Sequence, residues 1–313
     1  MRLKQLAVAL LAVCGLAATA QAAVCPNPIP TPLTPAQLAK VGSERGFLWR
    51  ISHGKTQSYL YGTIHANRVE GSALGPQVRS ALQASRQLVL ELDLDDASVS
   101  QQLLAGMQGK ANVPAAVKAR YQAQLARLCL PNALLEQLDI NFLMVTLTLL
   151  DAQLAGVEGS YGTENVLLQL AKQRQLPVKG LETVAEQLAA LKDDGELSLA
   201  QHEQALTMLE NGHGRQQLLK LVDVWNRRDW ATMSQYRSWC ECENTAEDRA
   251  AMVRLLDERN PRMAQRIDAL LREGQANFIA VGSLHLVGEH GLPNLLRQLG
   301  YKVEPVSLPA ASK

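Results

Sequence analysis

The stretch IAVGSLH, residues 279–285, repeats the pattern of YLYGTIH, residues 59–65. In both, an apolar run typical of a buried strand ends in Gly-x-x-His, and a hydroxyl residue directly follows the glycine. Glycine lets the backbone turn tightly at a strand end, and α/β proteins place ligand sites at the carboxyl ends of strands. We therefore expect both strands to share one sheet, so that His65 and His285 converge on a metal ion or a substrate carbonyl. The alternative for each histidine is a helix cap or a hydrogen bond within a loop.

Two glutamates belong to other predicted strands. Glu91 lies within the predicted strand 87–92, which is otherwise apolar. A buried carboxylate has to be paired, metal-bound or protonated, so we interpret Glu91 as a metal ligand or general base beside His65; the alternative is an exposed strand end. Glu182 directly follows the short predicted strand 177–181. It lies at the first turn of a helix, where the helix dipole favours a carboxylate with or without another role.

Other polar residues carry weaker signals. Thr183 and Glu186 have the spacing of a capping box, which predicts a helix start at Thr183. Arg259 occurs among charges that are typical of a solvated helix face. Four further histidines are expected to be solvated in polar loops or on helix surfaces: His53, His202, His213 and His290.

The remaining segments predict a sheet assembled from the two ends of the chain. Residues 47–52 and 58–62 flank a polar loop that contains a glycine, which predicts a β-hairpin. After the second Gly-x-x-His stretch we expect a helix over residues 292–299 and a last strand over 301–306. Apolar residues between the two ends recur mainly at helical spacing. We therefore expect an α/β fold with a central mixed sheet built from N- and C-terminal segments and a large helical insertion at about residues 98–272.

The first 22 residues have the pattern of a signal peptide. Two basic residues precede the apolar stretch 6–18, and Ala20-Gln21-Ala22 has the small-x-small form of a cleavage site. A membrane anchor needs about 18–20 apolar residues, so we expect cleavage after residues 1–22 and export to the periplasm or beyond the cell. Residues 23–45, which are rich in proline, are expected to form an extended lead-in, and residues 46–313 a single domain.

Composition excludes several classes of protein. The 313 residues are 47% hydrophobic, which excludes an intrinsically disordered chain. The formal net charge is +1 and becomes −1 when the two basic residues of the signal peptide are removed. Such a neutral protein has no field that attracts a polyanion, so we expect no nucleic-acid partner. The most apolar mature stretch, residues 142–150, is too short to span a bilayer, so we expect a core helix and no stable membrane insertion.

The cysteines that remain after cleavage are Cys25, Cys129, Cys240 and Cys242. An even number of cysteines in an exported protein predicts disulfides, here two. A direct Cys240–Cys242 bridge would close a very small ring, so we expect each of these two cysteines to pair with Cys25 or Cys129. The alternative is a metal site on Cys240-Glu241-Cys242, which lacks a second closely spaced pair of ligands.

Taken together, the motifs resemble the TraB/GumN family, a group that includes the Tiki proteases. The matching blocks occur in family order over nearly the whole mature chain: YLYGTIH (59–65), LVLELD (88–93), GTE (162–164), PVKGLETVAEQL (177–188), ERN (258–260) and FIAVGSLHLVGEHGL (278–292). Tiki-type members are described as metal-dependent proteases with two Gly-x-x-His motifs and a glutamate, and the resemblance assigns these roles to His65, His285 and Glu91. It also points to Arg259, as part of an Arg-Asn pair, and to Glu182 as a supporting carboxylate.

The resemblance implies an exported metal-dependent hydrolase that acts on peptides or another small substrate. His65, His285 and Glu91 would hold zinc, manganese or cobalt, with Arg259 steadying an oxyanion or substrate carboxylate and Glu182 orienting a ligand histidine. The wider superfamily also contains erythromycin-esterase-like hydrolases and haem-binding ChaN-type proteins, so fold alone leaves two alternatives. One is a metal-independent esterase in which a histidine activates water. The other is a non-enzymatic carrier that binds haem or a metal through His65 and His285.

Overall fold

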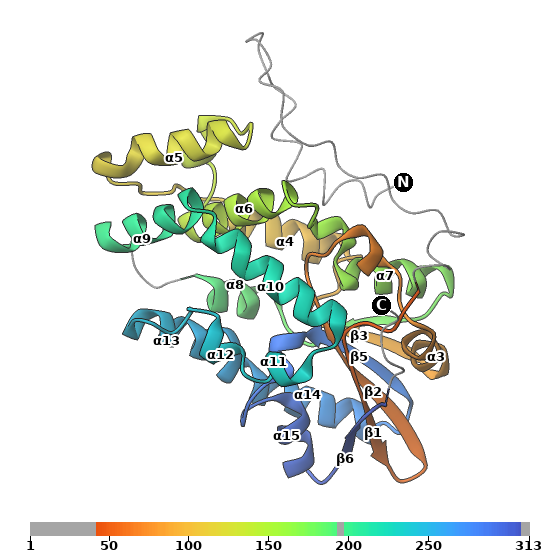
Figure 1. Cartoon of the computed structure of the whole chain (residues 1–313). Coiled ribbons are helices and arrows are strands. Elements are labelled where there is room, and N and C mark those ends of the chain that lie inside the picture. The colour runs from red at the N-terminus through yellow and green to blue at the C-terminus, as the bar shows by residue number, and fades with distance from the viewer. Residues whose placement is uncertain (1–41, 193–196, 308–313) are drawn as a thin grey trace.

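The computed structural model describes residues 42–192 and 197–307, and its centre is one six-stranded mixed sheet (Figure 1). The strands, in the order in which they lie in the sheet, are β4 (Val178–Gly180), β3 (Gln87–Leu90), β5 (Asn277–Gly282), β2 (Thr56–Thr63), β1 (Phe47–His53) and β6 (Lys302–Pro305). The predicted α/β fold with a central mixed sheet is therefore confirmed. The predicted signal peptide, 1–22, and most of the predicted lead-in, 23–45, lie outside the described residues.

β1 and β2 form the predicted hairpin, with a tighter turn than expected. They pair antiparallel as far as His53↔Thr56, which leaves only Gly54 and Lys55 in the loop. Gly54 has a φ of 59°, in the left-handed region that glycine adopts without steric cost. Two-residue loops with such a backbone match the twist of the flanking strands, so this glycine sets the register of the hairpin.

β5 lies between β2 and β3 and runs parallel to both. Its residues from Phe278 to Val281 are completely buried, as expected for a strand that is covered on both faces. The register places Thr63 of β2 opposite Gly282 of β5. The strands of the two Gly-x-x-His stretches therefore lie in one sheet, as the sequence predicts, and the structure shows that they end side by side.

β3 is shorter than the predicted strand 87–92. It ends at Leu90, and the chain bends at Glu91. Two hydrogen bonds still join the segments that follow β3 and β4: Leu181 N donates to Leu90 O, and Glu182 N donates to Glu91 O. Glu91 thus lies directly after a strand and not within it. Because β2, β3, β4 and β5 are parallel, their carboxyl ends meet at one edge of the sheet.

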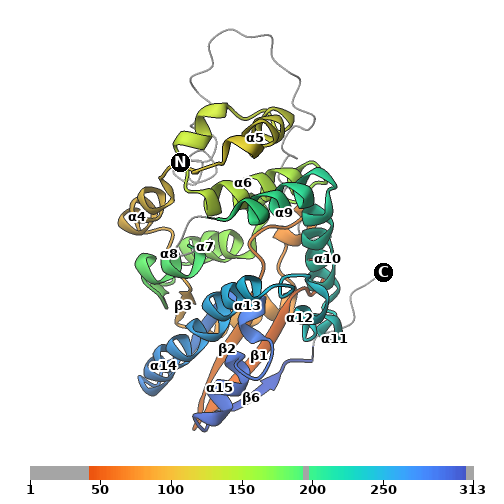
Figure 2. The ribbon, with the colours of Figure 1, turned by 90° about the vertical axis from the view of Figure 1, so that its left-hand side faces the viewer.

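Helices surround the sheet and form an outer group beyond its carboxyl edge, on the side opposite the β1–β2 turn (Figures 1 and 2). The helices are α3 (Pro76–Ala84), α4 (Ala97–Met107), α5 (Ala115–Arg127), α6 (Ile140–Gln153), α7 (Thr163–Gln173), α8 (Val184–Leu191), α9 (Leu199–Glu210), α10 (His213–Arg227), α11 (Trp230–Met233), α12 (Tyr236–Trp239), α13 (Ala246–Met252), α14 (Arg259–Arg272) and α15 (Leu292–Gln298). The last helix and strand expected from the sequence are α15 and β6. In the described part of the chain, no helix has the length and apolarity of a membrane span.

The outer helices α5, α6 and α9 enclose a hydrophobic core of their own. The predicted core helix 142–150 is the centre of α6, where Leu143 and Leu147 are completely buried. His202 of α9 is also only 1% exposed, and its Nδ1 lies 2.9 Å from the hydroxyl of Tyr121 on α5. The prediction of a solvated His202 is therefore wrong, because the surrounding helices cover the ring.

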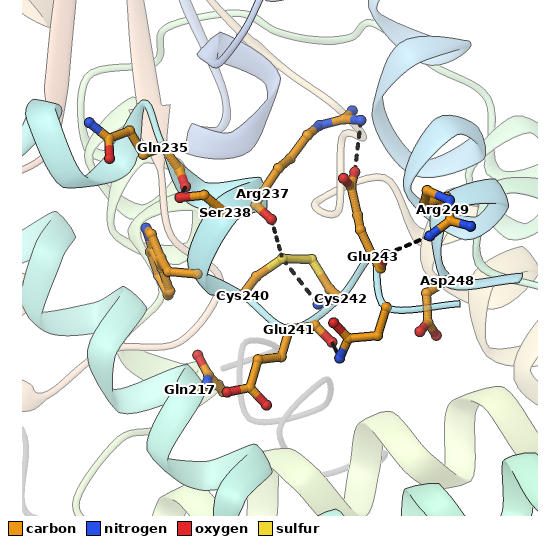
Figure 3. The surroundings of a disulfide bond; sticks show 12 residues. Gln217, Gln235, Arg237, Ser238, Cys240, Glu241, Cys242, Glu243, Asp248 and Arg249 are labelled. Carbon is orange, nitrogen blue, oxygen red and sulfur yellow. Dashed lines mark hydrogen bonds and ion pairs between the residues drawn. A yellow bond between two sulfur atoms is a disulfide. The ribbon is translucent and has the colours of Figure 1, made fainter. Parts of the chain in front are cut away.

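Cys240 and Cys242 are bonded to each other, which corrects the prediction that each pairs with Cys25 or Cys129 (Figure 3). The intervening Glu241 has a φ of 55°, in the left-handed region. This backbone conformation curls the chain and lets two sulfurs only two residues apart meet. Cys129 is disulfide-bonded as well, and Cys25 lies outside the described residues.

Candidate functional site

The five side chains selected from the sequence come together at the carboxyl edge of the sheet. His65 follows β2, Glu91 follows β3, Glu182 follows β4, and His285 lies in the short 3-10 helix η6 (Ser283–Leu286) directly after β5. Arg259, the first residue of α14, reaches both glutamates. Parallel strands thus carry four of these groups to the edge where α/β sheets bind their ligands.

Glu91 is buried, and both oxygens of its carboxylate are engaged. Oε1 accepts the backbone N–H of Gly282 at 2.7 Å and lies 3.7 Å from Nε2 of His285. Oε2 accepts hydrogen bonds from Arg259 at 2.8 Å and from Gln187 at 3.0 Å. Burial acts to raise the pKa of Glu91, but the charges of the neighbouring histidines and of Arg259, with the bond from Gly282, lower it to about 2. Glu91 is therefore an anion at neutral pH.

Arg259 is buried between two carboxylates, although its sequence context is typical of a solvated face. Its Nε donates to the oxygens of Glu182 at 2.9 and 3.2 Å, and its Nη2 donates to Glu182 at 2.5 Å as well as to Glu91. The carbonyl of Leu255 accepts from Nη1 at 3.1 Å. Burial acts to lower the pKa of Arg259. The hydrogen bond to Glu182 and the negative charges of Glu91 and Glu182 outweigh burial, so the pKa is raised. Glu182 therefore acts on Glu91 through the guanidinium.

His285 is buried, and its neighbours determine which ring nitrogen carries the proton. Asn260 donates its Nδ2 to the carbonyl of His290 at 2.8 Å, so its Oδ1 faces Nδ1 of His285 at 2.5 Å. An amide oxygen can only accept, so Nδ1 is protonated and Nε2, on the side of Glu91, keeps its lone pair. Burial lowers the pKa of His285 to about 4, and the ring is neutral at neutral pH.

His65 is held through Nδ1 by Glu164, a residue that the strand-end motifs of the sequence do not predict. Oε1 of Glu164 lies 2.8 Å from this nitrogen and accepts the hydroxyl of Thr63 at 2.5 Å. The charge of Glu164 is the main cause that raises the pKa of His65 to about 9. In the sequence, the one signal for Glu164 is its place in the GTE block of the family resemblance.

The side chains of the three candidate ligands meet around the α-carbon of Gly282, which carries no side chain. A Cβ atom there would lie 3.3 Å from Oε1 of Glu91, 3.5 Å from Nε2 of His65 and 3.7 Å from Cδ2 of His285. Imidazole nitrogens and a carboxylate oxygen are ligand types that suit zinc, manganese or cobalt. Within residues 42–192 and 197–307, no three His, Cys, Asp or Glu side chains form a ready metal-binding group. The donor types and their convergence therefore fit a divalent ion, without a preformed three-ligand geometry.

Comparison with known proteins places the site in a family. The sequence profile of the TraB/PrgY/gumN family matches residues 47–305. The uncharacterized protein YbaP of Shigella flexneri is 25% identical over 248 residues, which cover 78% of this chain and 89% of YbaP, and YbaP of Escherichia coli K12 gives the same values. The metalloprotease TIKI2 of Danio rerio is 46% identical over 52 residues, 16% of this chain and 10% of TIKI2. No solved structure has significant similarity to the chain. Because the profile runs from β1 to β6 and includes every residue of the site, the chain belongs to the TraB/PrgY/gumN family.

Proposed function

We propose that the protein is a metal-dependent hydrolase that cleaves peptide bonds. The observation that carries this proposal is the convergence of His65, His285 and Glu91 on the space beside Gly282. The similarity of a short segment to a metalloprotease supports the choice of peptides as the substrate class.

In this proposal, His65 and His285 would hold a divalent ion through their imidazole nitrogens, and Glu91 would hold it through its carboxylate. A bound ion supplies Lewis-acid chemistry, because it polarises a carbonyl group and lowers the pKa of a water molecule toward neutrality. The neutral ring of His285 already presents a free lone pair, since Asn260 fixes its proton on Nδ1.

Arg259 and Glu182 act as a positioning pair for Glu91. The guanidinium is buried, and its nitrogens donate to the two glutamates and to the carbonyl of Leu255. In this proposal the guanidinium holds the carboxylate of Glu91 in place, instead of steadying an oxyanion as the family resemblance implies. The carboxylate of Glu182 compensates the positive charge of Arg259 in the interior.

Export is part of the proposal. The pattern of residues 1–22 is that of a signal peptide, and disulfides such as Cys240–Cys242 persist in oxidising compartments. We expect the protein in the periplasm or outside the cell, with a mature chain that begins at Ala23. Edman sequencing of the secreted protein tests this point, and a mature chain that still begins at Met1 would contradict it.

Metal content gives the first test. Mature protein is incubated separately with zinc, manganese and cobalt, desalted, and analysed by mass spectrometry of its metals. We expect about one bound ion per chain, which His65→Ala and His285→Ala both lose. His213→Ala is the matched control, because His213 pairs with a glutamate, Glu241, away from the site. Full occupancy in both site variants would rule out this ligand set.

Cleavage of a peptide library, with and without chelator, gives the second test. The proposal expects turnover that the chelator abolishes and the metal restores. Ester hydrolysis that is insensitive to chelator would instead favour a metal-independent esterase. Absence of turnover, together with a Soret band on adding haem that His65→Ala and His285→Ala remove, would favour the carrier.

A further inference from the structure

The two histidines of the site differ in how their surroundings hold them. The side chain of His285 is only 4% exposed, so packing fixes it, whereas the side chain of His65 is 70% exposed. An exposed imidazole has access to several rotamers, and ordering it on ligand binding costs conformational entropy. A functional role for His65 therefore requires a contact that orients the ring beforehand.

Glu164 makes this contact, and it also binds Thr63, which ends the strand that precedes His65. One oxygen, Oε1, lies 2.8 Å from Nδ1 of His65 and accepts the hydroxyl of Thr63 at 2.5 Å. Thr63 is the last residue of β2. The carboxylate therefore fixes the imidazole relative to the strand that precedes it.

The backbone in turn places Glu164. Its predecessor Thr163 begins α7 and is bonded to Ile64 in both directions: Thr163 N donates to Ile64 O at 2.9 Å, and Ile64 N donates to Thr163 Oγ1 at 3.2 Å. Gly162 packs so closely on the carbonyl of His65 that a Cβ atom has no room there. The first turn of α7 also favours a carboxylate through the helix dipole. The GTE block, 162–164, is thus docked on the turn that carries His65.

We propose that Glu164 is a positioning residue that holds His65 through Nδ1 and thereby directs Nε2 into the space beside Gly282. Asn260 holds His285 through the same ring atom, and the ring atoms nearest to the position of a Cβ on Gly282 are Nε2 of His65 and Cδ2 of His285. The consequence for ligand binding rests on the proposed function, in which His65 is a ligand. Loss of such a partner from a metal-binding histidine typically weakens metal binding about 10- to 100-fold.

Zinc titration of the metal-free mature protein by calorimetry tests the effect on binding. Glu164→Ala should weaken zinc binding about 10- to 100-fold. Glu164→Gln keeps an oxygen that accepts from Nδ1 and should weaken it less. The control is Glu241→Ala, which removes a His–Glu pair of the same 2.8 Å length at His213 and should leave zinc affinity unchanged. Zinc affinity that is the same in Glu164→Ala and wild type would overturn the inference.

Crystal structures of the metal-free proteins give a readout that does not depend on zinc. We expect the ring of His65 to leave its orientation toward Gly282 in Glu164→Ala and to keep it in Glu164→Gln, with His285 unchanged in both. An unmoved His65 ring in Glu164→Ala would overturn the positioning role, whatever the zinc affinity. If wild type binds no zinc, manganese or cobalt but the ring moves in Glu164→Ala, the proposed function fails and the positioning role is supported.

Discussion

Nη2 of Arg259 lies 2.8 Å from Oε2 of Glu91, although 168 residues separate the two in the chain. Both side chains are buried, and the same guanidinium also holds Glu182. The centre of the site is therefore a buried triad of charges. Such a group tolerates burial only while each charge is compensated, so removing the shared cation leaves two carboxylates facing each other away from water.

Arg259→Met should lower the free energy of unfolding by about 3–5 kcal/mol, because it leaves Glu91 and Glu182 unpaired in the interior. Urea denaturation measures the loss. Arg120→Met is the control, since it breaks a solvent-accessible pair with Glu210 that contributes little to stability. Equal losses in the two variants would contradict a compensated triad.

Gly282→Ala should fold but lose metal binding. The backbone of Gly282 has a φ of −49°, which alanine adopts readily, and the added methyl group would occupy the space 3.3 Å from Glu91 and 3.5 Å from His65. We expect a stability change of about 1 kcal/mol and at least a tenfold weaker binding of zinc. Gly214→Ala, whose methyl group meets no atom closer than 3.8 Å, is the control for calorimetry and urea denaturation. Unchanged zinc affinity in Gly282→Ala would show that this space is not the binding site.

The metal-free protein should be most stable near pH 6.5 as far as its two site histidines are concerned. Burial lowers the pKa of His285 from 6.5 in the unfolded chain to about 4 in the folded protein. The contribution of His285 to the free energy of unfolding is therefore complete above pH 6.5 and is lost as the pH falls toward 4. Folding raises the pKa of His65 from 6.5 to about 9, chiefly through the charge of Glu164. The contribution of His65 to the free energy of unfolding is therefore complete below pH 6.5 and is lost as the pH rises toward 9.

Urea denaturation at a series of pH values checks these signs. His285→Asn should flatten the acid side of the curve, and His65→Asn should flatten the alkaline side. An acid slope that persists in His285→Asn would show that other groups cause it.

Proteolysis without reduction should release one peptide that contains both Cys240 and Cys242 and is two hydrogens lighter than its reduced form. Mass spectrometry of the digest decides this directly. A crosslink from either cysteine to the peptide of Cys129 would contradict the local bridge. Replacing both cysteines by serine should cost about 1–2 kcal/mol, since a small ring constrains the unfolded chain only slightly.

The sequence predicts those elements whose signals lie in neighbouring residues. Gly54 marks the hairpin turn, and the capping box of Thr183 and Glu186 is present at the start of α8. The repeated Gly-x-x-His pattern also predicts that β2 and β5 lie in one sheet, and the structure adds that the two strands pair directly.

Other features depend on contacts that no local pattern encodes. Glu164 and Thr63 are 101 residues apart and meet only because α7 docks on the end of β2. Arg259 has the neighbours of a solvated residue, and only its tertiary contacts with the two glutamates reveal its burial. The bridge between Cys240 and Cys242 follows from a single backbone angle, at Glu241. Each of these facts arises from the packing of distant segments or from one torsion that side-chain type does not specify.

The central position of β5 in the sheet has a consequence for biosynthesis. β2 and β3 leave the ribosome before the whole helical insertion, yet both pair with β5, which is among the last segments to be made. Pairing over such distances is slow, because the intervening loop has to close first. An N-terminal fragment that ends before β5 therefore cannot assemble the site, which forms only when synthesis of the chain is nearly complete.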